Sequence, residues 1–172
     1  FNNNNKTITS DYPSEIKDSD GNTIKLDIFN YQTVKKFFYS KGSIEILDIN
    51  ENVYQLTEVF IDANQNKIVG TDIKAFLNQK SLKVNESNEP RFFSNTVVIN
   101  DGKSHFNKGV FTYCKDEGEE KCPVWSLLAD KITHDTAKKT IYYDNATLKI
   151  FDFPIFYFPK FAHPDPTVKR RS

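Results

Sequence analysis

The chain has 172 residues, enough for one domain of ordinary size with a hydrophobic core. Its 23 basic and 23 acidic residues cancel, which argues against a nucleic-acid-binding surface because such surfaces usually carry a basic excess. No apolar run reaches the roughly 18 residues that a membrane-spanning helix needs. The chain contains no Met and starts at Phe1, so we expect it to be a segment of a longer protein.

After a polar, Asn-rich leading segment at residues 1–11, expected to be frayed, the chain is a series of short β-prone runs. The one helix candidate, Thr33–Tyr39, is too short and too rich in aromatic and β-branched residues to hold alone. The expected strands are Thr23–Tyr31, Ser43–Ile49, Val53–Asp62, Lys67–Leu77, Lys80–Val84, Arg91–Asn100, Lys103–Tyr113, Thr140–Tyr143 and Ala146–Phe151.

Turn residues separate these runs about every ten positions. Asp, Asn and Gly tolerate the positive φ of a tight turn, so such pairs between apolar runs are strong hairpin signals. Segments near 24–49, 53–84 and 91–113 each read as strand, turn, strand, which predicts an all-β fold of stacked rungs, a sandwich or solenoid-like jelly roll. The expected turns are Asp20–Asn22, Lys41–Gly42, Asn50–Asn52, Asn64–Asn66, Asn78–Gln79, Asp101–Gly102, Thr136–Lys139 and Asp144–Asn145.

Alternation within the runs predicts one apolar face and one mixed face for the sheet. Strict alternation places Tyr54, Leu56 and Phe60 on one face of their strand. It places Val59 and Ile61 on the opposite face. The cleaner face is expected to look into an apolar interior, and a register shift of one residue would exchange the two sets.

Cys114 and Cys122 flank an acidic stretch, Asp116–Glu120. A structural zinc site needs four ligands, so a local disulfide is favoured over zinc, with two free thiols as the alternative. A disulfide would stabilise the fold by about 2–3 kcal/mol and would indicate an oxidising compartment. The acidic stretch lacks the spacing of an EF-hand loop.

Motifs for catalysis are missing from the sequence. There is no Gly-rich phosphate loop, HExxH or G-x-S-x-G, and His105, His134 and His163 lie on separate segments. A carbohydrate-active jelly-roll enzyme would need convergent carboxylates, for which the sequence gives no indication. We therefore expect no enzymatic activity and no cofactor.

Aromatic residues alternate with prolines from Phe151 to Phe161. Proline lacks an amide donor and biases the preceding residue toward extended geometry, so this strip is expected outside any fully paired central strand. An exposed strip of this composition is an aggregation hazard, and we expect something outside the chain to cover it.

The C-terminal third carries a family likeness. Over Tyr113–Ser172 the sequence resembles the bacterial lipopolysaccharide-assembly family LptD, or OstA, and is most similar to its alphaproteobacterial branch. The first 110 residues match only loosely, through the strand-turn-strand rungs. The residues that carry the likeness are Cys122-Pro123-x-Trp125, Ala129–Ile132 with His134-Asp135, Tyr142-Tyr143-x-Asn145-Ala146, Phe153–Pro159 and His163–Ser172.

The resemblance implies an open, V-shaped antiparallel β-jelly roll at the periplasmic face of the outer membrane. Residues 1–11 would lead into an OstA-like jelly roll at 12–160, and 161–172 would join it to an outer-membrane β-barrel. Such a domain passes lipopolysaccharide along an apolar groove that shields the lipid A acyl chains while the sugars stay outside. The alternative is a structural scaffold or plug for barrel assembly that binds no lipid.

The implied partners are lipopolysaccharide, the chain's own barrel with its lipoprotein plug, and a bridge protein of the same fold that adds to an edge strand within Tyr12–Tyr31. Family disulfides often link jelly roll and barrel, so pairing of Cys114 or Cys122 with barrel cysteines is a further possibility. The expected groove residues, taken from the alternation, are Ile73, Ala75, Leu77, Phe93, Val97, Ile99, Phe111, Tyr113, Leu127, Ala129, Leu148 and Ile150.

Overall fold

The computed structural model describes residues 6–78, 88–115, 124–164 and 168, without the side chains of residues 88, 89 and 113–115. These parts of the chain form only strands and turns. The strands are β1 (Thr7–Ser10), β2 (Ser14–Lys17), β3 (Thr23–Gln32), β4 (Phe37–Leu47), β5 (Val53–Asp62), β6 (Lys67–Phe76), β7 (Asn88–Asn100), β8 (Lys103–Lys115), β9 (Trp125–Asp135), β10 (Thr140–Ile150) and β11 (Phe153–Pro164).

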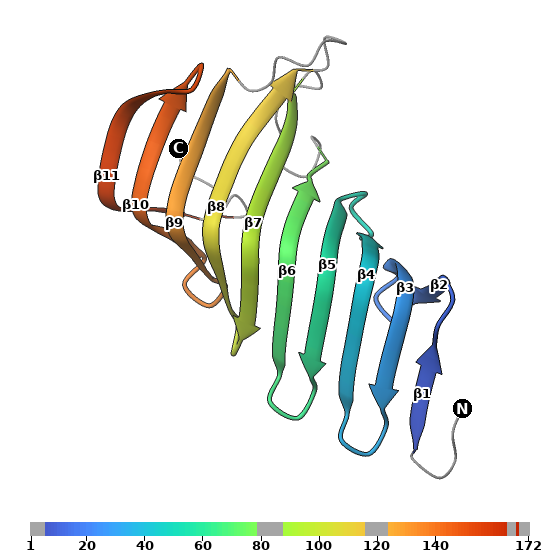
Figure 1. The fold of residues 1–172 in the computed structure, drawn as a ribbon. Coiled ribbons are helices and arrows are strands. Elements are labelled where there is room, and N and C mark those ends of the chain that lie inside the picture. The colour runs from blue at the N-terminus through green and yellow to red at the C-terminus, as the bar shows by residue number, and fades with distance from the viewer. Residues whose placement is uncertain (1–5, 79–87, 116–123, 165–167, 169–172) are drawn as a thin grey trace.

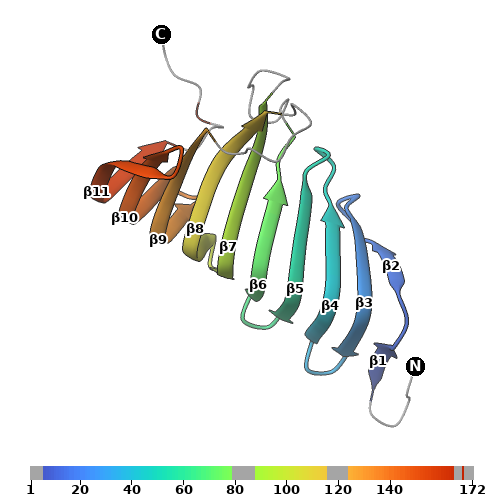
Figure 2. The same ribbon diagram turned by 45° about the horizontal axis from the view of Figure 1, so that its top comes forward.

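All of these strands belong to one antiparallel sheet that follows the order of the chain (Figure 1 and Figure 2). From β3 to β11 every strand pairs with its neighbours in sequence, and β1 and β2 both pair with β3. The sheet does not close on itself, so β11 is an edge strand at one end. The predicted all-β, open antiparallel fold is therefore confirmed.

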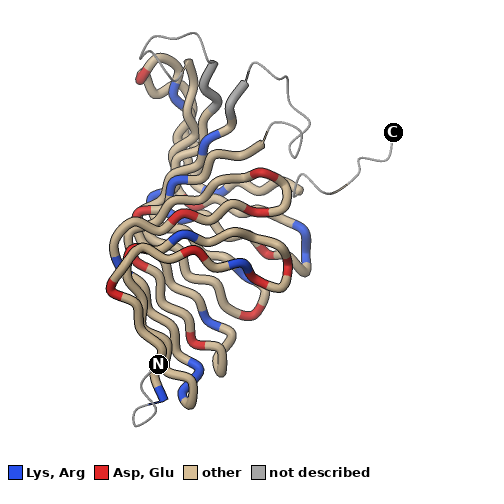
Figure 3. Tube along the Cα trace, turned by 90° about the vertical axis from the view of Figure 1, so that its right-hand side faces the viewer, with Lys and Arg blue, Asp and Glu red and all other residues tan. Residues whose placement is uncertain are grey.

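A line of unpaired residues crosses the middle of the sheet. At this line one or two residues of each strand are left out of the pairing, and the register changes there only in the two pairs that contain β4. The strands bend there, as the view from the N-terminal side shows (Figure 3). We call this the bend line; it consists of Asp27, Gly42, Thr57, Asp72, Asn95, Lys108, Asp130, Asn145 and Pro159.

At the bend line every second strand from β4 to β10 has a residue with positive φ. On β4 there is also an extra residue, a β-bulge, because Gly42 and Ser43 together lie opposite one residue of each neighbouring strand. Gly42 of β4, Asp72 of β6, Lys108 of β8 and Asn145 of β10 have φ of 108°, 51°, 52° and 52°. A residue in this left-handed region bends its strand locally, and because these residues are aligned across the strands they fold the whole sheet. Gly and Asn adopt this conformation readily, whereas for most other residues it costs about 1–2 kcal/mol.

Polar side chains at the bend line bind one another and the backbone. The Thr57 hydroxyl donates to Asp72 Oδ2 at 2.7 Å, and the Ser43 amide donates to Asp27 Oδ2 at 2.6 Å. The side-chain amide of Asn145 donates to Asp130 Oδ2 at 3.0 Å. These bonds replace ladder bonds that are missing at the bend line, so the bend leaves few backbone or side-chain groups without partners.

Two predicted turns are wrong for the same reason. Lys41–Gly42 lies within β4 and Asp144–Asn145 lies within β10, each at the bend rather than at a chain reversal. Residues that tolerate positive φ occur both in chain-reversing turns and in bends within a strand, and the local sequence does not distinguish the turn from the bend.

Most of the other predicted elements agree with the structure, but β2 and β9 were not among the expected strands and β4 begins before the expected Ser43. The expected turn Asn78–Gln79 lies partly outside the described residues. Thr7–Ser10, within the leading segment expected to be frayed, forms β1 and pairs with β3. Thr33–Tyr39 forms no helix; it contains a turn and the start of β4. The expected strand Lys80–Val84 lies outside the described residues.

The positive φ of Lys108 gives a first testable prediction. Lys108→Gly should raise the free energy of unfolding by about 1 kcal/mol, because Gly reaches φ 52° without the steric cost of a side chain. Lys131→Gly is the matched control on the neighbouring strand, where positive φ is not required, and it should lower stability by about 0.5–1 kcal/mol. Equal losses in urea denaturation of the two variants would contradict the assignment of strain to Lys108.

Candidate functional site

Four rows of mainly apolar residues run along the inside of the bent sheet, two on each side of the bend line. Cross-strand pairing aligns the residues of each row from β3 to β11. The two rows next to the bend line are here called the bend rows, and the two farther rows are the rim rows. In β3 and in β5 to β11 the inward positions follow the pattern i, i+2, i+5, i+7, because the alternation shifts by one residue at the bend line. In β4, which has the bulge, the pattern is i, i+2, i+6, i+8.

The bend rows form the packed core. Leu26, Ile44 and Val59 form one buried cluster, and Ala129, Ile132, Tyr143 and Ala146 form a second. The first bend row is Leu26, Ile44, Leu56, Ile73, Ser94, Gly109, Ala129, Ala146 and Phe158. The second is Phe29, Ser40, Val59, Gly70, Val97, Phe106, Ile132, Tyr143 and Phe161.

Small residues let the two arms of the sheet approach each other at the bend. A Cβ added to Gly70 would lie 2.7 Å from Leu56 Cδ2, a residue of the opposite bend row. A Cβ added to Gly109 would contact Ile132 of the opposite bend row and would lie 3.3 Å from Phe92 Cε2. Large side chains therefore fill the space above the glycines, and the bottom of the V is closed by packing.

The buried serines of the bend rows are satisfied by backbone carbonyls. Ser40 Oγ donates to the Ile28 carbonyl at 2.8 Å, and Ser94 Oγ donates to the Asn107 carbonyl at 2.7 Å. Both bonds lie beside the bend line, where the ladder is interrupted. A buried hydroxyl with a partner costs little, so these serines are compatible with an otherwise apolar interior.

The rim rows are half-buried and form the mouth of the V. Several of their side chains pack on the buried clusters, among them Ile46, Phe92 and Ile141. The first rim row is Ile24, Ile46, Tyr54, Ala75, Phe92, Phe111, Leu127, Leu148 and Phe156. The second is Tyr31, Phe38, Ile61, Ile68, Ile99, Ser104, His134, Ile141 and His163.

At the C-terminal end the inner rows become aromatic. The ring of Tyr143 lies 5.5 Å from the rings of Phe161 and His163, and its hydroxyl lies 3.0 Å from His163 Nε2. Burial raises the pKa of Tyr143 to about 12, so the phenol stays neutral at physiological pH. The inner face therefore ends in a group of aromatic rings where β10 meets β11, an edge strand whose side chains are nearly all exposed.

One rim residue, Tyr54, is tied to the β4–β5 turn. Its hydroxyl lies 3.3 Å from Asp48 Oδ2, and Asp48 also accepts hydrogen bonds from the amides of Asn50 and Asn52. Burial and the negative charge of Asp48 raise the pKa of Tyr54 to about 12. Burial also opposes ionisation of Asp48, but the hydrogen bonds from Asn52, Asn50 and Tyr54 outweigh it and lower the pKa of Asp48. Tyr54 thus presents a neutral, fixed ring to the mouth.

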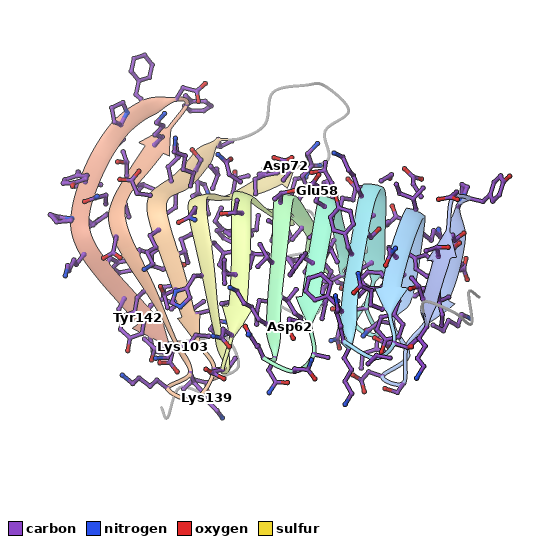
Figure 4. All side chains as sticks on the ribbon, turned by 60° about the horizontal axis from the view of Figure 1, so that its bottom comes forward. Glu58, Asp62, Asp72, Lys103, Lys139 and Tyr142 are labelled. Atoms are coloured by element: carbon purple, nitrogen blue, oxygen red, sulfur yellow. The ribbon has the colours of Figure 1, made fainter. Side chains whose placement is uncertain are left out.

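The outside of the bend is polar. Glu58 and Asp72 lie close to each other on neighbouring strands, and Lys41 Nζ lies 3.2 Å from Glu58 (Figure 4). A surface hollow of about 1010 Å³ here is lined mainly by charged and polar side chains, including Lys74 and Thr57. The hydrogen bond and the negative charge of Glu58 raise the pKa of Lys41. The inner face is thus mainly apolar, whereas the outer face is mixed, with charged and polar side chains at the bend and apolar ones such as Phe60, Phe93 and Val98 on either side of it.

Most expected groove residues lie on the inner face. Phe93 does not: it pairs with Lys74 and Val110 on the outer face. The side chains of Tyr113 and Cys114, and all of Cys122, lie outside the described residues, and so does the expected disulfide. Leu77 and Ile150 lie just beyond the first rim row. Leu77 is the residue after β6, and Ile150 is the last residue of β10. In the inner rows are Ile73, Ala75, Val97, Ile99, Phe111, Leu127, Ala129 and Leu148.

The strict alternation predicted for β5 is wrong beyond Thr57. Tyr54 and Leu56 face inward as expected, but Val59 and Ile61 face inward as well, and both belong to the inner cluster or pack against it. The gap in pairing at Thr57 shifts the alternation of β5 by one residue and so turns them inward. The whole N-terminal cluster around Leu26 and Ile44 was also absent from the expected groove. Polar or Gly residues at the middle of each strand are the signal that would have located the bend.

In the described ranges there is no group of three or more His, Cys, Asp or Glu side chains arranged to hold a metal ion. The same ranges contain no helix with the length and hydropathy of a membrane span.

Comparison with known proteins identifies no relative: no family model matches the chain, and no curated protein matches it.

Proposed function

We propose that this chain conveys lipopolysaccharide without changing it chemically, by shielding the lipid A acyl chains between the two rim rows. The observation that carries the proposal is the continuity of the four inner rows across nine strands, β3 to β11. At a strand spacing of about 4.8 Å these rows extend over roughly 40 Å. That length exceeds the hydrocarbon part of one bilayer leaflet, about 15 Å, so an acyl chain fits along the rows.

Burial against the apolar lining can stabilise a lipid A acyl chain by a large free energy. Burial of each CH2 group contributes about 0.8 kcal/mol, so a chain of about twelve carbons gains on the order of 9 kcal/mol as an upper bound before ordering costs. The half-buried rim residues offer this contact without unfolding the bend, whose rows are already packed. The polar outside of the bend remains in water.

The proposed substrate and location come from the resemblance of Tyr113–Ser172 to the LptD, or OstA, family. It favours lipopolysaccharide over other lipids, and the periplasmic face of a bacterial outer membrane as the location. On this proposal a protein of the same fold delivers the lipid at the β1 and β2 side, and a barrel following β11 receives it.

The close packing of the bend supports a second candidate function. Ile44 and Ala146 are 1% and 0% exposed, and side chains of the two arms of the sheet contact each other at the bend. A domain closed in this way also suits a structural scaffold for barrel assembly that binds no lipid. The two functions differ in whether lipid ever contacts the rim rows.

Site-specific photo-crosslinking distinguishes the two functions. A crosslinker at Phe111 or Ile99, in the rim rows, should capture lipopolysaccharide in cells that assemble it. The adjacent outward positions Val110 and Val98 on the same strands are the matched controls and should capture much less. Equal capture at inward and outward positions would contradict the groove. No capture at any position, with outer-membrane assembly intact, would favour the scaffold.

A further inference from the structure

Two hairpins of the described chain close with two-residue turns in which both residues have positive φ. In the β7–β8 hairpin these residues are Asp101 and Gly102, at 48° and 71°. In the β10–β11 hairpin they are Phe151 and Asp152, at 46° and 66°. Asp-Gly is among the pairs that this turn favours, whereas a bulky aromatic residue rarely adopts positive φ. Phe151 therefore occupies its position against the conformational preference of its side chain.

Phe151 is also exposed, together with its apolar neighbours. Phe151 and Phe153 are 67% and 70% exposed, and Val124 and Ile150 are 47% and 39% exposed. The Phe151 amide donates to the Val124 carbonyl at 3.0 Å, so Val124, the residue before β9, lies against the turn. We call these four residues the hairpin tip; it lies at the end of β10 and the start of β11 (Figure 1). Phe151 thus combines an unfavourable backbone conformation with an apolar side chain exposed to water. A residue with both properties indicates a binding surface.

The size of the hairpin tip argues against a stable protein interface. With about 150–250 Å² for a fully exposed aromatic side chain, the tip offers roughly 400 Å² of apolar surface. A standard interface buries about 800 Å² on each partner. The adjoining edge of β11 is also a poor template for strand addition, because Pro154, Pro159 and Pro164 have no amide hydrogen to donate.

Docking on a bilayer surface requires neither a large buried area nor a strand edge that can donate hydrogen bonds. The bilayer accepts a small convex apolar tip without a reciprocal pocket and without hydrogen bonds from the partner. Trp125, which pairs with Ile150, adds a ring of the kind that is enriched at membrane interfaces. We propose that the hairpin tip docks on a lipid bilayer, with Phe151 and Phe153 as its anchors.

The charges beside the tip set the expected character of this binding. Lys149 and Asp152 flank Phe151 and have opposite charges, so the tip has little net attraction for anionic headgroups. Binding by apolar insertion should therefore respond weakly to salt and to the fraction of anionic lipid. This inference does not depend on the proposed lipopolysaccharide transport.

Vesicle flotation with the 172-residue chain tests the proposal. The probe is vesicles of phosphatidylethanolamine and phosphatidylglycerol that contain no lipopolysaccharide, so the outcome is separable from groove binding. The double variant Phe151→Asp/Asp152→Gly copies the turn of the β7–β8 hairpin. It should lower the vesicle partition coefficient by about tenfold or more, because one buried Phe side chain contributes that much.

Two controls make the result decisive. Val34→Ser removes an apolar side chain that is also 67% exposed, at the turn after β3 on the opposite end of the strands, and should leave partitioning unchanged. The double variant should unfold at the same temperature as the original chain or higher, because Asp-Gly suits the turn. Unchanged partitioning of the double variant, absence of vesicle binding by the original chain, or a loss of binding in 0.5 M salt would overturn the proposal. Dimerisation of the original chain that the double variant abolishes would also overturn it, in favour of a protein interface.

Discussion

Replacing Ile44 with Ala is expected to lower the free energy of unfolding by about 2–5 kcal/mol. Ile44 is 1% exposed and packs with Leu26 and Val59 at the bottom of the V. Truncation removes buried methyl groups and leaves a cavity where two arms of the sheet meet, so neighbouring side chains have little freedom to collapse into it. Urea denaturation followed by circular dichroism measures the change.

The control for Ile44 lies on the same strand. Leu47 is 43% exposed, and Leu47→Ala should cost less than about 1 kcal/mol. Domains of this kind are stable by about 5–15 kcal/mol, so the Ile44 variant should show a clear loss while remaining folded at low temperature. Similar losses for both variants would mean that the bend is not the core of the fold.

Replacing Gly109 with Val should destabilise the fold by about 1–3 kcal/mol or more. A side chain at Gly109 would overlap Ile132 and press on Phe92, which lies on the adjacent strand. Gly109 does not have positive φ, so the expected loss comes from overpacking rather than from backbone strain. The measurement is again the free energy of unfolding in urea.

A second substitution tests that explanation. Ile132→Ala alone should destabilise by creating a cavity, but in the Gly109→Val background the two changes compensate in volume. The double variant should therefore be more stable than the sum of the two single losses predicts. Strict additivity would show that Gly109 and Ile132 do not contact each other across the bend.

The hairpin order of the sheet could be predicted because most reversals carry local turn chemistry. Asn50–Asn52, Asn64–Asn66 and Asp101–Gly102 all lie between strands, as expected. The aromatic strip was predicted to avoid a fully paired central position, and it forms β11, the last strand of the sheet. In both cases the determining property, positive φ or a missing amide, belongs to the residue itself.

The bend could not be predicted from the same information. Gly42 and Asn145 have the conformations of turn residues but lie in the middle of strands, where other residues of the bend line align with them. Alignment across strands is a property of the whole sheet, and a single run does not show it. The inner face was therefore only partly predicted, with Phe93 placed on the wrong side and Ile61 left out.

A polar residue, Gly or Pro in the middle of each strand from β3 to β11 is the sequence feature that marks the bend. In β5 it is Thr57, with Leu56 inward before it and Val59 inward after it. A spacing of three between inward residues at the same relative place in successive strands would identify such a bend in related sequences.

The proposed function requires lipid to contact the inner face of the sheet, whose alternation shifts at the bend line. A crosslinking scan along β5 tests this requirement most directly. Crosslinkers at Tyr54 and Ile61, in the two rim rows, should both capture lipopolysaccharide, while Gln55 and Phe60 should not. The spacing of seven residues between the capturing positions is the signature of the bend. Capture at Tyr54 and Phe60 with none at Ile61 would indicate an unbent strand and would contradict both the groove and its geometry.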